Sequence, residues 1–193
     1  MEKKVDLRVQ KTRSALTAAL YDLLCEKSLD DITVTELCKR AVIRKATFYK
    51  HFGDKNELLT YMIQQLQDIA LEENMLGYDE NIPQSYYIGV FRYFIDFLES
   101  NEKFVVSILQ SSASSGVQDI LSKQIQLDIK SHLKKDEYPD VSAPSAMLAA
   151  IYAGAIVSCG KWWILSKNRP DKESIVKAFS EFVMKLWSNE NSE

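Results

Sequence analysis

The sequence predicts an all-α protein with about nine helices, because its apolar residues recur at helical spacing over most of the chain. Leu16, Leu20, Leu23 and Leu24, for example, fall on one helix face. Only 6 Gly and 4 Pro interrupt the 193 residues, and no stretch shows the alternating pattern of a half-buried strand. Two apolar strings, VVSI and AIVS, each lie inside a longer helical window, so their context favours helix.

The N-terminal part of the chain divides into four helices, two of them short. They are expected over residues 6–27, from 33 or 35 to 40, over 44–51 and over 54–73. Thr33 with Glu36, and Asp54 with Glu57, have the three-residue spacing of a capping box, which marks two of the starts.

Five further helices are expected after a turn at Gly77. They cover residues 84–99, 102–110, 115–135, 143–167 and 172–188. The apolar run from Met147 to Gly160 is shorter than the roughly 20 residues that a bilayer span needs. We therefore expect a buried core helix or a dimer helix there, and no membrane partner.

Charge is distributed unevenly along the chain. The formal net charge is −3, yet residues 1–55 carry 12 basic and 8 acidic side chains, which leaves 12 basic and 19 acidic for the remainder. A basic module on an acidic body indicates that the first part meets phosphates, although chance scatter of charge would look similar. The three cysteines are widely spaced and no secretory leader is visible, so we expect a cytoplasmic protein without disulfides.

Two short helices preceded by a longer one describe a helix-turn-helix unit. Its second short helix, RKATFYKHF at 44–52, mixes basic, hydroxyl and aromatic side chains, whereas Ala46 and Phe48 are expected to face inward. Arg44, Lys45 and Thr47 could reach bases or phosphates in a major groove. The alternative is a solvated, charged helix.

The string ITVTELCKRAVIRKATFYKHFGDKNELL (32–59) resembles the DNA-binding domain of the TetR family of transcriptional regulators. The likeness includes the Thr-Val entry, the T-F-Y-x-x-F core and the D-K-x-E-L-L start of the next helix. Residues 8–27 resemble that family's first helix, and YAGAIVSCGKWWI (152–164) resembles the short, DhaS-type members.

The resemblance implies a DNA-binding domain at 1–53 and a ligand-binding and dimerisation domain at 54–193. It also implies a repressor that a small apolar ligand releases from a palindromic operator, with no cofactor and no metal. The residues that match the family's DNA-contacting positions are Thr33, Arg44, Lys45, Thr47, Tyr49, Lys50, His51 and Lys55.

The turn before the recognition helix departs from the family pattern. Val42, Ile43 and Arg44 stand where members usually carry Gly, Val and Ser. Without the Gly, the turn either avoids a positive φ or tolerates strain. Without the Ser, the recognition helix loses its usual N-cap, a change typically worth about 1 kcal/mol.

A homodimer is expected, because two-fold symmetry places two recognition helices in successive grooves. The last two helices supply small and apolar faces that favour an interface, and the alternative is that these faces belong to the core of the chain itself. The expected interface residues are Ala150, Gly154, Val157, Phe179, Val183 and Leu186.

Aromatic residues gather in the acidic body, where they indicate either a packed core or a pocket for an apolar or aromatic effector. The expected lining is Tyr61, Leu66, Tyr87, Phe91, Phe94, Phe104, Ile108 and Trp162.

Two other functional classes remain open from the sequence. An enzyme is disfavoured, because the two histidines, His51 and His132, stand outside any H-E-x-x-H motif and no G-x-S-x-G or Gly-rich phosphate loop is present. A helical partner-binding protein that has lost DNA binding would explain the altered turn. The operator sequence, the effector and the direction of regulation cannot be derived from the residues.

Overall fold

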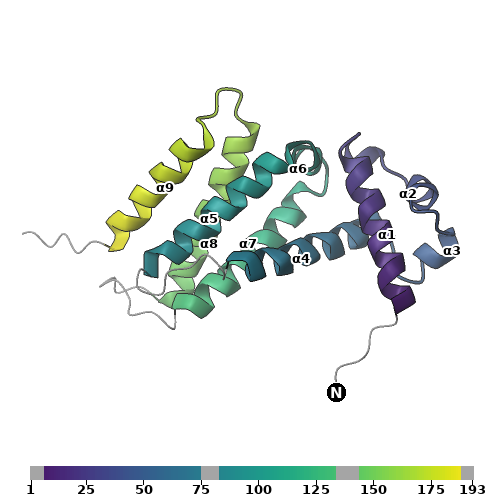
Figure 1. Cartoon of the computed structure of the whole chain (residues 1–193), viewed down its shortest axis with the longest axis horizontal. Helices are drawn as coiled ribbons and strands as arrows, with labels where there is room; N and C mark the ends of the chain where they lie inside the picture. Colours follow the sequence, from purple (N-terminus) through teal and green to yellow (C-terminus); the bar gives the residue numbers. More distant parts are fainter. Residues whose placement is uncertain (1–6, 75–82, 134–143, 188–193) are drawn as a thin grey trace, which may run out of the picture. The chain divides into compact units, whose positions relative to one another are not determined.

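The computed structural model describes residues 7–74, 83–133 and 144–187, and every regular element in these ranges is helical (Figure 1). Nine α-helices and one 3-10 turn are found there, which confirms the predicted fold class. In chain order they are α1 (Leu7–Leu24), η1 (Leu29–Asp31), α2 (Val34–Arg40), α3 (Lys45–Phe48), α4 (Lys55–Asn74), α5 (Pro83–Ser100), α6 (Glu102–Leu109), α7 (Ser114–Leu133), α8 (Ser145–Leu165) and α9 (Lys172–Trp187).

The chain folds into two compact units. Unit 1 consists of Met1–Leu66 and Lys103–Val117, and unit 2 consists of Gln67–Glu102 and Gln118–Glu193. The first part of α4 and nearly all of α6 thus fold with the N-terminal helices. The domain boundary after residue 53 stays a prediction.

The core of unit 1 comes from the apolar faces of α1 to α4. Its fully buried residues include Leu16, Leu20, Leu37, Phe48 and Leu58. Helix α6 joins this core from elsewhere in the sequence, since the ring of Phe104 stacks on that of Tyr21 with centroids 5.0 Å apart.

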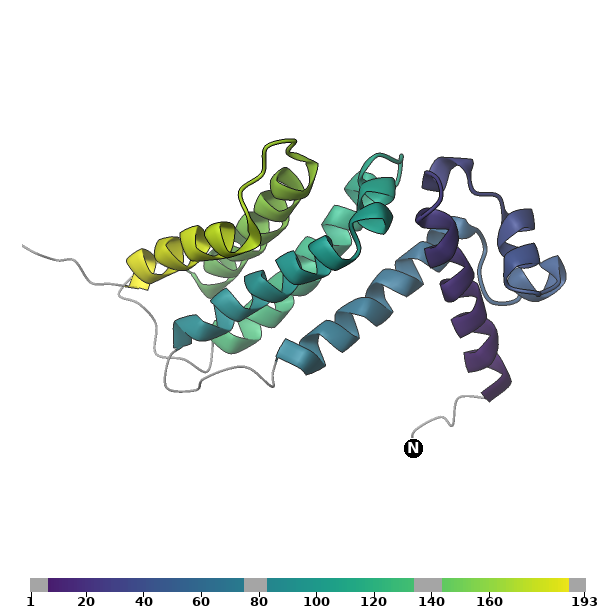
Figure 2. The same cartoon turned by 45° about the horizontal axis from the view of Figure 1, so that its top comes forward.

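Unit 2 is built around α5, which packs against both α8 and α9 (Figure 2). Phe91 of α5 stacks on Phe179 of α9 at 3.9 Å between ring centroids. Helix α8 comes so close that a Cβ atom added at Gly160 would lie 2.4 Å from Cε1 of Phe94. A side chain at position 160 would therefore force the side chains of Phe94 and Leu98 to move.

Helix α8 is apolar on all sides. Among the described helices it alone has the length and composition to cross a membrane, with 44% of its most apolar window buried inside the protein. A core helix passes the same test. The packing of α8 on α5 agrees with the first of the two alternatives that the sequence left open, a core helix or a dimer helix.

Candidate nucleic-acid interface

The start of α2 is fixed by the predicted capping box. The backbone N–H of Glu36 donates to Oγ1 of Thr33 at 3.2 Å, and the Thr33 N–H donates to Oε2 of Glu36 at 3.0 Å. Two free donors at the helix start are thereby satisfied. Thr33 therefore caps α2, as the sequence predicted, and its contact with a phosphate stays a prediction.

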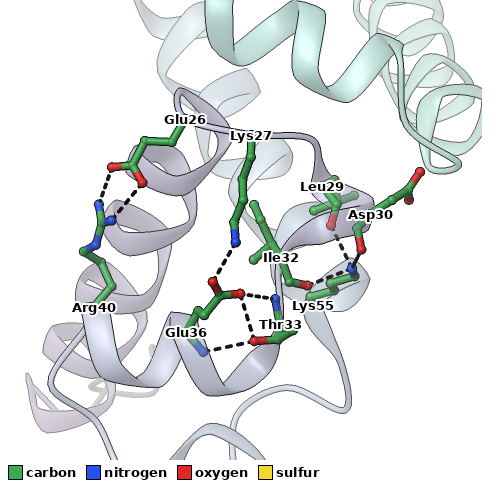
Figure 3. A network of polar contacts seen from close by, with 9 residues as sticks. All are labelled: Glu26, Lys27, Leu29, Asp30, Ile32, Thr33, Glu36, Arg40 and Lys55. Atoms are coloured by element: carbon green, nitrogen blue, oxygen red, sulfur yellow. Dashed lines mark hydrogen bonds and ion pairs between the residues drawn. The ribbon is translucent and has the colours of Figure 1, made fainter.

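Two ion pairs hold α2 against the end of α1, as Figure 3 shows. Nζ of Lys27 lies 2.6 Å from Oε1 of Glu36, and the guanidinium of Arg40 donates two bonds of 2.9 Å to the Glu26 carboxylate. The Lys27 ammonium, together with the hydrogen bonds from Thr33, lowers the pKa of Glu36 from 4.5 to about 2. These carboxylates therefore stay ionised at neutral pH, and Arg40 is already neutralised.

Helix α2 ends in a Schellman turn centred on Val42. The Ile43 N–H donates to the Cys38 carbonyl at 2.9 Å, and the Val42 N–H donates to the Lys39 carbonyl at 3.3 Å. This motif requires a left-handed residue after the helix cap, usually glycine. Val42 takes that conformation with φ 56°. The turn therefore keeps the geometry of a glycine turn, with strain, and the alternative of a negative φ is wrong.

The recognition segment begins at α3 and continues as single turns to Phe52. Arg44, its N-cap residue, makes no side-chain capping bond, as the sequence predicted. The segment is anchored by Phe48 and Phe52, which are both buried. Ala46 is exposed, so its expected inward orientation is wrong; it lies two residues from Phe48 and thus on the opposite side of the helix.

The outward side of this segment carries most of the predicted DNA contacts. Thr47 and His51 are half-buried, and the exposed members are Arg44, Lys45, Tyr49 and Lys50. Their basic side chains form no ion pair with any residue in the described ranges. The surface is therefore cationic and available to phosphate.

Lys55 was predicted to contact a phosphate, but in the structure its ammonium binds backbone carbonyls of the chain itself. Its Nζ donates to the carbonyl oxygens of Leu29 at 2.7 Å, Asp30 at 3.0 Å and Ile32 at 2.8 Å (Figure 3). An ammonium has three hydrogens, so none remains for a phosphate. We therefore place Lys55 among the residues that hold η1 to α4.

Arg13 and the α6–α7 turn also support this unit, and neither role was predicted. The Arg13 guanidinium lies 5.0 Å from the ring centroid of Tyr61 and 5.9 Å from that of Phe52. The Ser112 hydroxyl donates to Oδ1 of Asp30 at 2.6 Å, and this bond lowers the pKa of Asp30. These contacts join residues that are 39 to 82 positions apart in the sequence, so no local pattern predicts them.

The residues predicted for a dimer interface divide into two groups. Ala150 is exposed and Gly154 half-buried, whereas Val157, Phe179 and Val183 are buried inside unit 2. These three serve the core of the chain itself, because the faces of α8 and α9 that contain them pack against neighbouring helices. The side chain of Leu186 lies outside the described ones.

The residues predicted to line an effector pocket fall in different units. Tyr61, Leu66, Phe104 and Ile108 belong to unit 1, whereas Tyr87, Phe91, Phe94 and Trp162 belong to unit 2. Trp162 is exposed, and the buried indole is that of Trp163, which donates to the Pro170 carbonyl at 2.8 Å. The pocket stays a prediction.

A capped helix, a tight turn and an outward cationic segment on buried aromatic anchors define a helix-turn-helix module. Comparison with known proteins shows which kind of module it is. Residues 16–62 match the family model described as bacterial regulatory proteins, tetR family. Residues 16–62 therefore form a TetR-type DNA-binding domain, the kind of domain found in bacterial transcriptional regulators.

Individual proteins resemble this chain in the sequence of that domain and in the overall fold. The chain is 46% identical over 65 residues to the uncharacterized HTH-type transcriptional regulator YxbF of Bacillus subtilis, a match that covers 33% of this chain and 17% of that relative. A TetR-family regulator from Syntrophomonas wolfei has the same fold, with a TM-score of 0.73, 18% identity and coverage of 95% of this chain and 99% of that one. The dihydroxyacetone kinase operon activator DhaS is also similar, with a TM-score of 0.63, 19% identity and coverage of 91% and 96%.

Replacing Lys55 by Met should lower the free energy of unfolding by about 2 kcal/mol, because three carbonyls lose a charged donor while the aliphatic stem is kept. Urea denaturation measures this difference. The matched control is Lys50→Met, which removes an exposed ammonium from the recognition segment and should leave the stability nearly unchanged. Equal stability of the two variants would contradict the structural role of Lys55.

Replacing Val42 by Gly should raise the free energy of unfolding by about 1 kcal/mol, because a left-handed β-branched residue is strained and glycine is not. Ala41→Gly in the same turn is the control, since Ala41 has φ −76° and gains nothing from glycine. A loss of stability in the Val42 variant would show that the turn is not strained.

Proposed function

We propose that this protein is a transcriptional repressor that binds a palindromic operator as a homodimer in the cytoplasm and leaves it when a small apolar ligand binds. The observation that carries DNA binding is the recognition segment, whose cations are exposed and lack acidic partners among the described residues. Duplex phosphates would supply the missing negative charge, and Lys45 and Thr47 match family positions that face bases or nearby phosphates.

Binding to duplex DNA should weaken steeply with salt, because several lysines and arginines per subunit displace condensed counterions. Lys45→Ala or Thr47→Ala should change the preferred sequence in a selection from random duplexes. Lys50→Ala should lower the affinity for all sequences alike, since its expected contact is phosphate. Salt-independent binding, or the same selected consensus for the wild type and the Lys45 variant, would contradict this assignment.

The homodimer is supported by an exposed stripe along α8. Met147, Ile151, Gly154, Ser158 and Trp162 follow one another at steps of three and four residues, and all are exposed or half-exposed. A glycine inside a helix is less stable than alanine by about 0.5–1 kcal/mol. Apart from the neighbouring backbone of α8 itself, no atom in the described part of the chain lies within 4 Å of a Cβ added at Gly154, so no described contact requires a glycine there. A second α8 crossing at this point would require it.

Replacing Gly154 by Leu should convert the dimer to a monomer while the helical content stays the same, because a Cβ at this position meets no described atom of the protomer, whereas a leucine side chain would block a crossing helix. Analytical ultracentrifugation measures the change. The matched control is Gly116→Leu on α7, where an added Cβ also meets nothing within 4 Å. A Gly154 variant that remains dimeric would place the interface on another face.

The effector part of the proposal rests on connectivity. Helix α4 begins at Lys55, beside the recognition segment, and its residues from Gln67 onward belong to unit 2. Helix α6 contacts the α1–α2 loop through Ser107, whose hydroxyl donates to the Lys27 carbonyl at 2.7 Å, and both chain neighbours of α6, α5 and α7, lie mainly in unit 2. A ligand among the aromatic residues of unit 2 would therefore have two covalent routes to the DNA-binding helices.

Any compound that releases the protein from DNA should bind it more weakly when operator is present, by the same factor by which it weakens DNA binding. A coupling of about 1–3 kcal/mol corresponds to a 5–150-fold change. Calorimetric titration with and without operator measures both affinities. Equal ligand affinity in the two titrations would exclude this mechanism, and unchanged ligand affinity in Trp162→Ala would assign that residue to the α8 stripe alone.

A further inference from the structure

Val42 is the most exposed of the large apolar residues in the described part of the chain, with 91% of its surface accessible. It also has the only positive φ among the described non-glycine residues. A β-branched side chain in this conformation is strained, and strain is usually offset by packing around the residue. Here the isopropyl group packs against almost nothing, so the protomer gains no stability from it.

The surroundings of Val42 indicate what could contact it. The segment from Lys39 to Lys45 holds four basic residues and no acidic one. Arg40 is paired with Glu26, but Lys39, Arg44 and Lys45 are exposed and form no ion pair with a described residue. The apolar group therefore stands in the middle of a cationic segment, three residues before Lys45. The basic side chains of this segment attract phosphates, and the two methyl groups of Val42 are exposed among those side chains.

We propose that Val42 determines sequence specificity by contacting the 5-methyl group of a thymine in the major groove. Thymine is the base whose groove edge carries a methyl group, and apolar side chains recognise it by contact. The Schellman turn holds Val42 in place, because the two hydrogen bonds on either side of it fix the direction of its Cβ. This proposal rests on the DNA binding proposed above and adds one base-reading residue to it.

The experiment starts with a duplex selected by the wild-type protein from a random pool. Each thymine is then replaced in turn by uracil, which removes the 5-methyl group and keeps the hydrogen-bonding pattern. At the thymine that Val42 contacts, uracil should weaken wild-type binding about fourfold, the effect of one buried methyl group. The same replacement should leave the DNA affinity of the Val42→Gly and Val42→Ala variants unchanged, because both variants lack the γ-methyl groups.

Three controls separate the possible outcomes. Val42→Ala keeps an L-residue in the turn, so agreement between the two variants excludes a change in backbone freedom as the cause. Leu127→Ala removes an exposed apolar side chain from α7 and should respond to uracil as the wild type does. Circular dichroism and thermal unfolding establish that the variants are folded.

The proposal is overturned if every uracil replacement affects the Val42 variants as much as the wild type. It is also overturned if no thymine in the selected duplex is sensitive to the loss of its methyl group. Failure of the proposed function looks different, because the wild-type protein would then select no duplex at all.

Discussion

The contact on which the helix-turn-helix unit most depends is the Lys55 ammonium, which donates to three backbone carbonyls of the α1–α2 loop. A 3-10 turn leaves carbonyls without partners, and a cation is the strongest donor that can satisfy several at once. Lys55 is also the first residue of α4, directly after the recognition segment. The Nζ atom of Lys55 therefore links the loop before α2 to the start of α4, and this contact connects the two ends of the helix-turn-helix module.

Within that closed module, the recognition segment is positioned by burial more than by helix stability. Helix α3 has four residues and no side-chain cap, so its own hydrogen bonds would not hold it. Phe48 and Phe52 are buried one helical turn apart, and Arg13 lies near the Phe52 ring. The buried Phe48 and Phe52 and the strained turn at Val42 position the segment, so its outward side chains are not needed to hold it in place. Substitutions among these outward side chains can therefore change which bases are contacted without loss of the fold.

The sequence predicted the elements well and the tertiary contacts poorly, for a physical reason. Capping boxes, helical periodicity and the family motif are local patterns, and the starts of α2 and α4 follow from them. Lys55 matched a DNA-contacting position of the family, yet its partners are carbonyls 23 to 26 residues away, which no pattern around it reveals. The Ser112 bond to Asp30 spans 82 residues and was likewise missed. The sequence showed that Val42 departs from the family's usual glycine, but only the structure of the turn shows that its φ is positive.

Helix α8 shows why an interface is hard to locate from an apolar sequence. In an amphipathic helix the buried face is recognised because the opposite face is polar, whereas α8 has few polar residues on any face. Its two central glycines look alike in the sequence and differ in the structure. Gly160 is required by the chain itself, since Phe94 and Leu98 occupy the space of a side chain, whereas the space around Gly154 is empty. The same residue type therefore marks a close helix crossing inside the protomer at Gly160, whereas at Gly154 it has no described neighbour, which is why the proposed dimer interface is placed there.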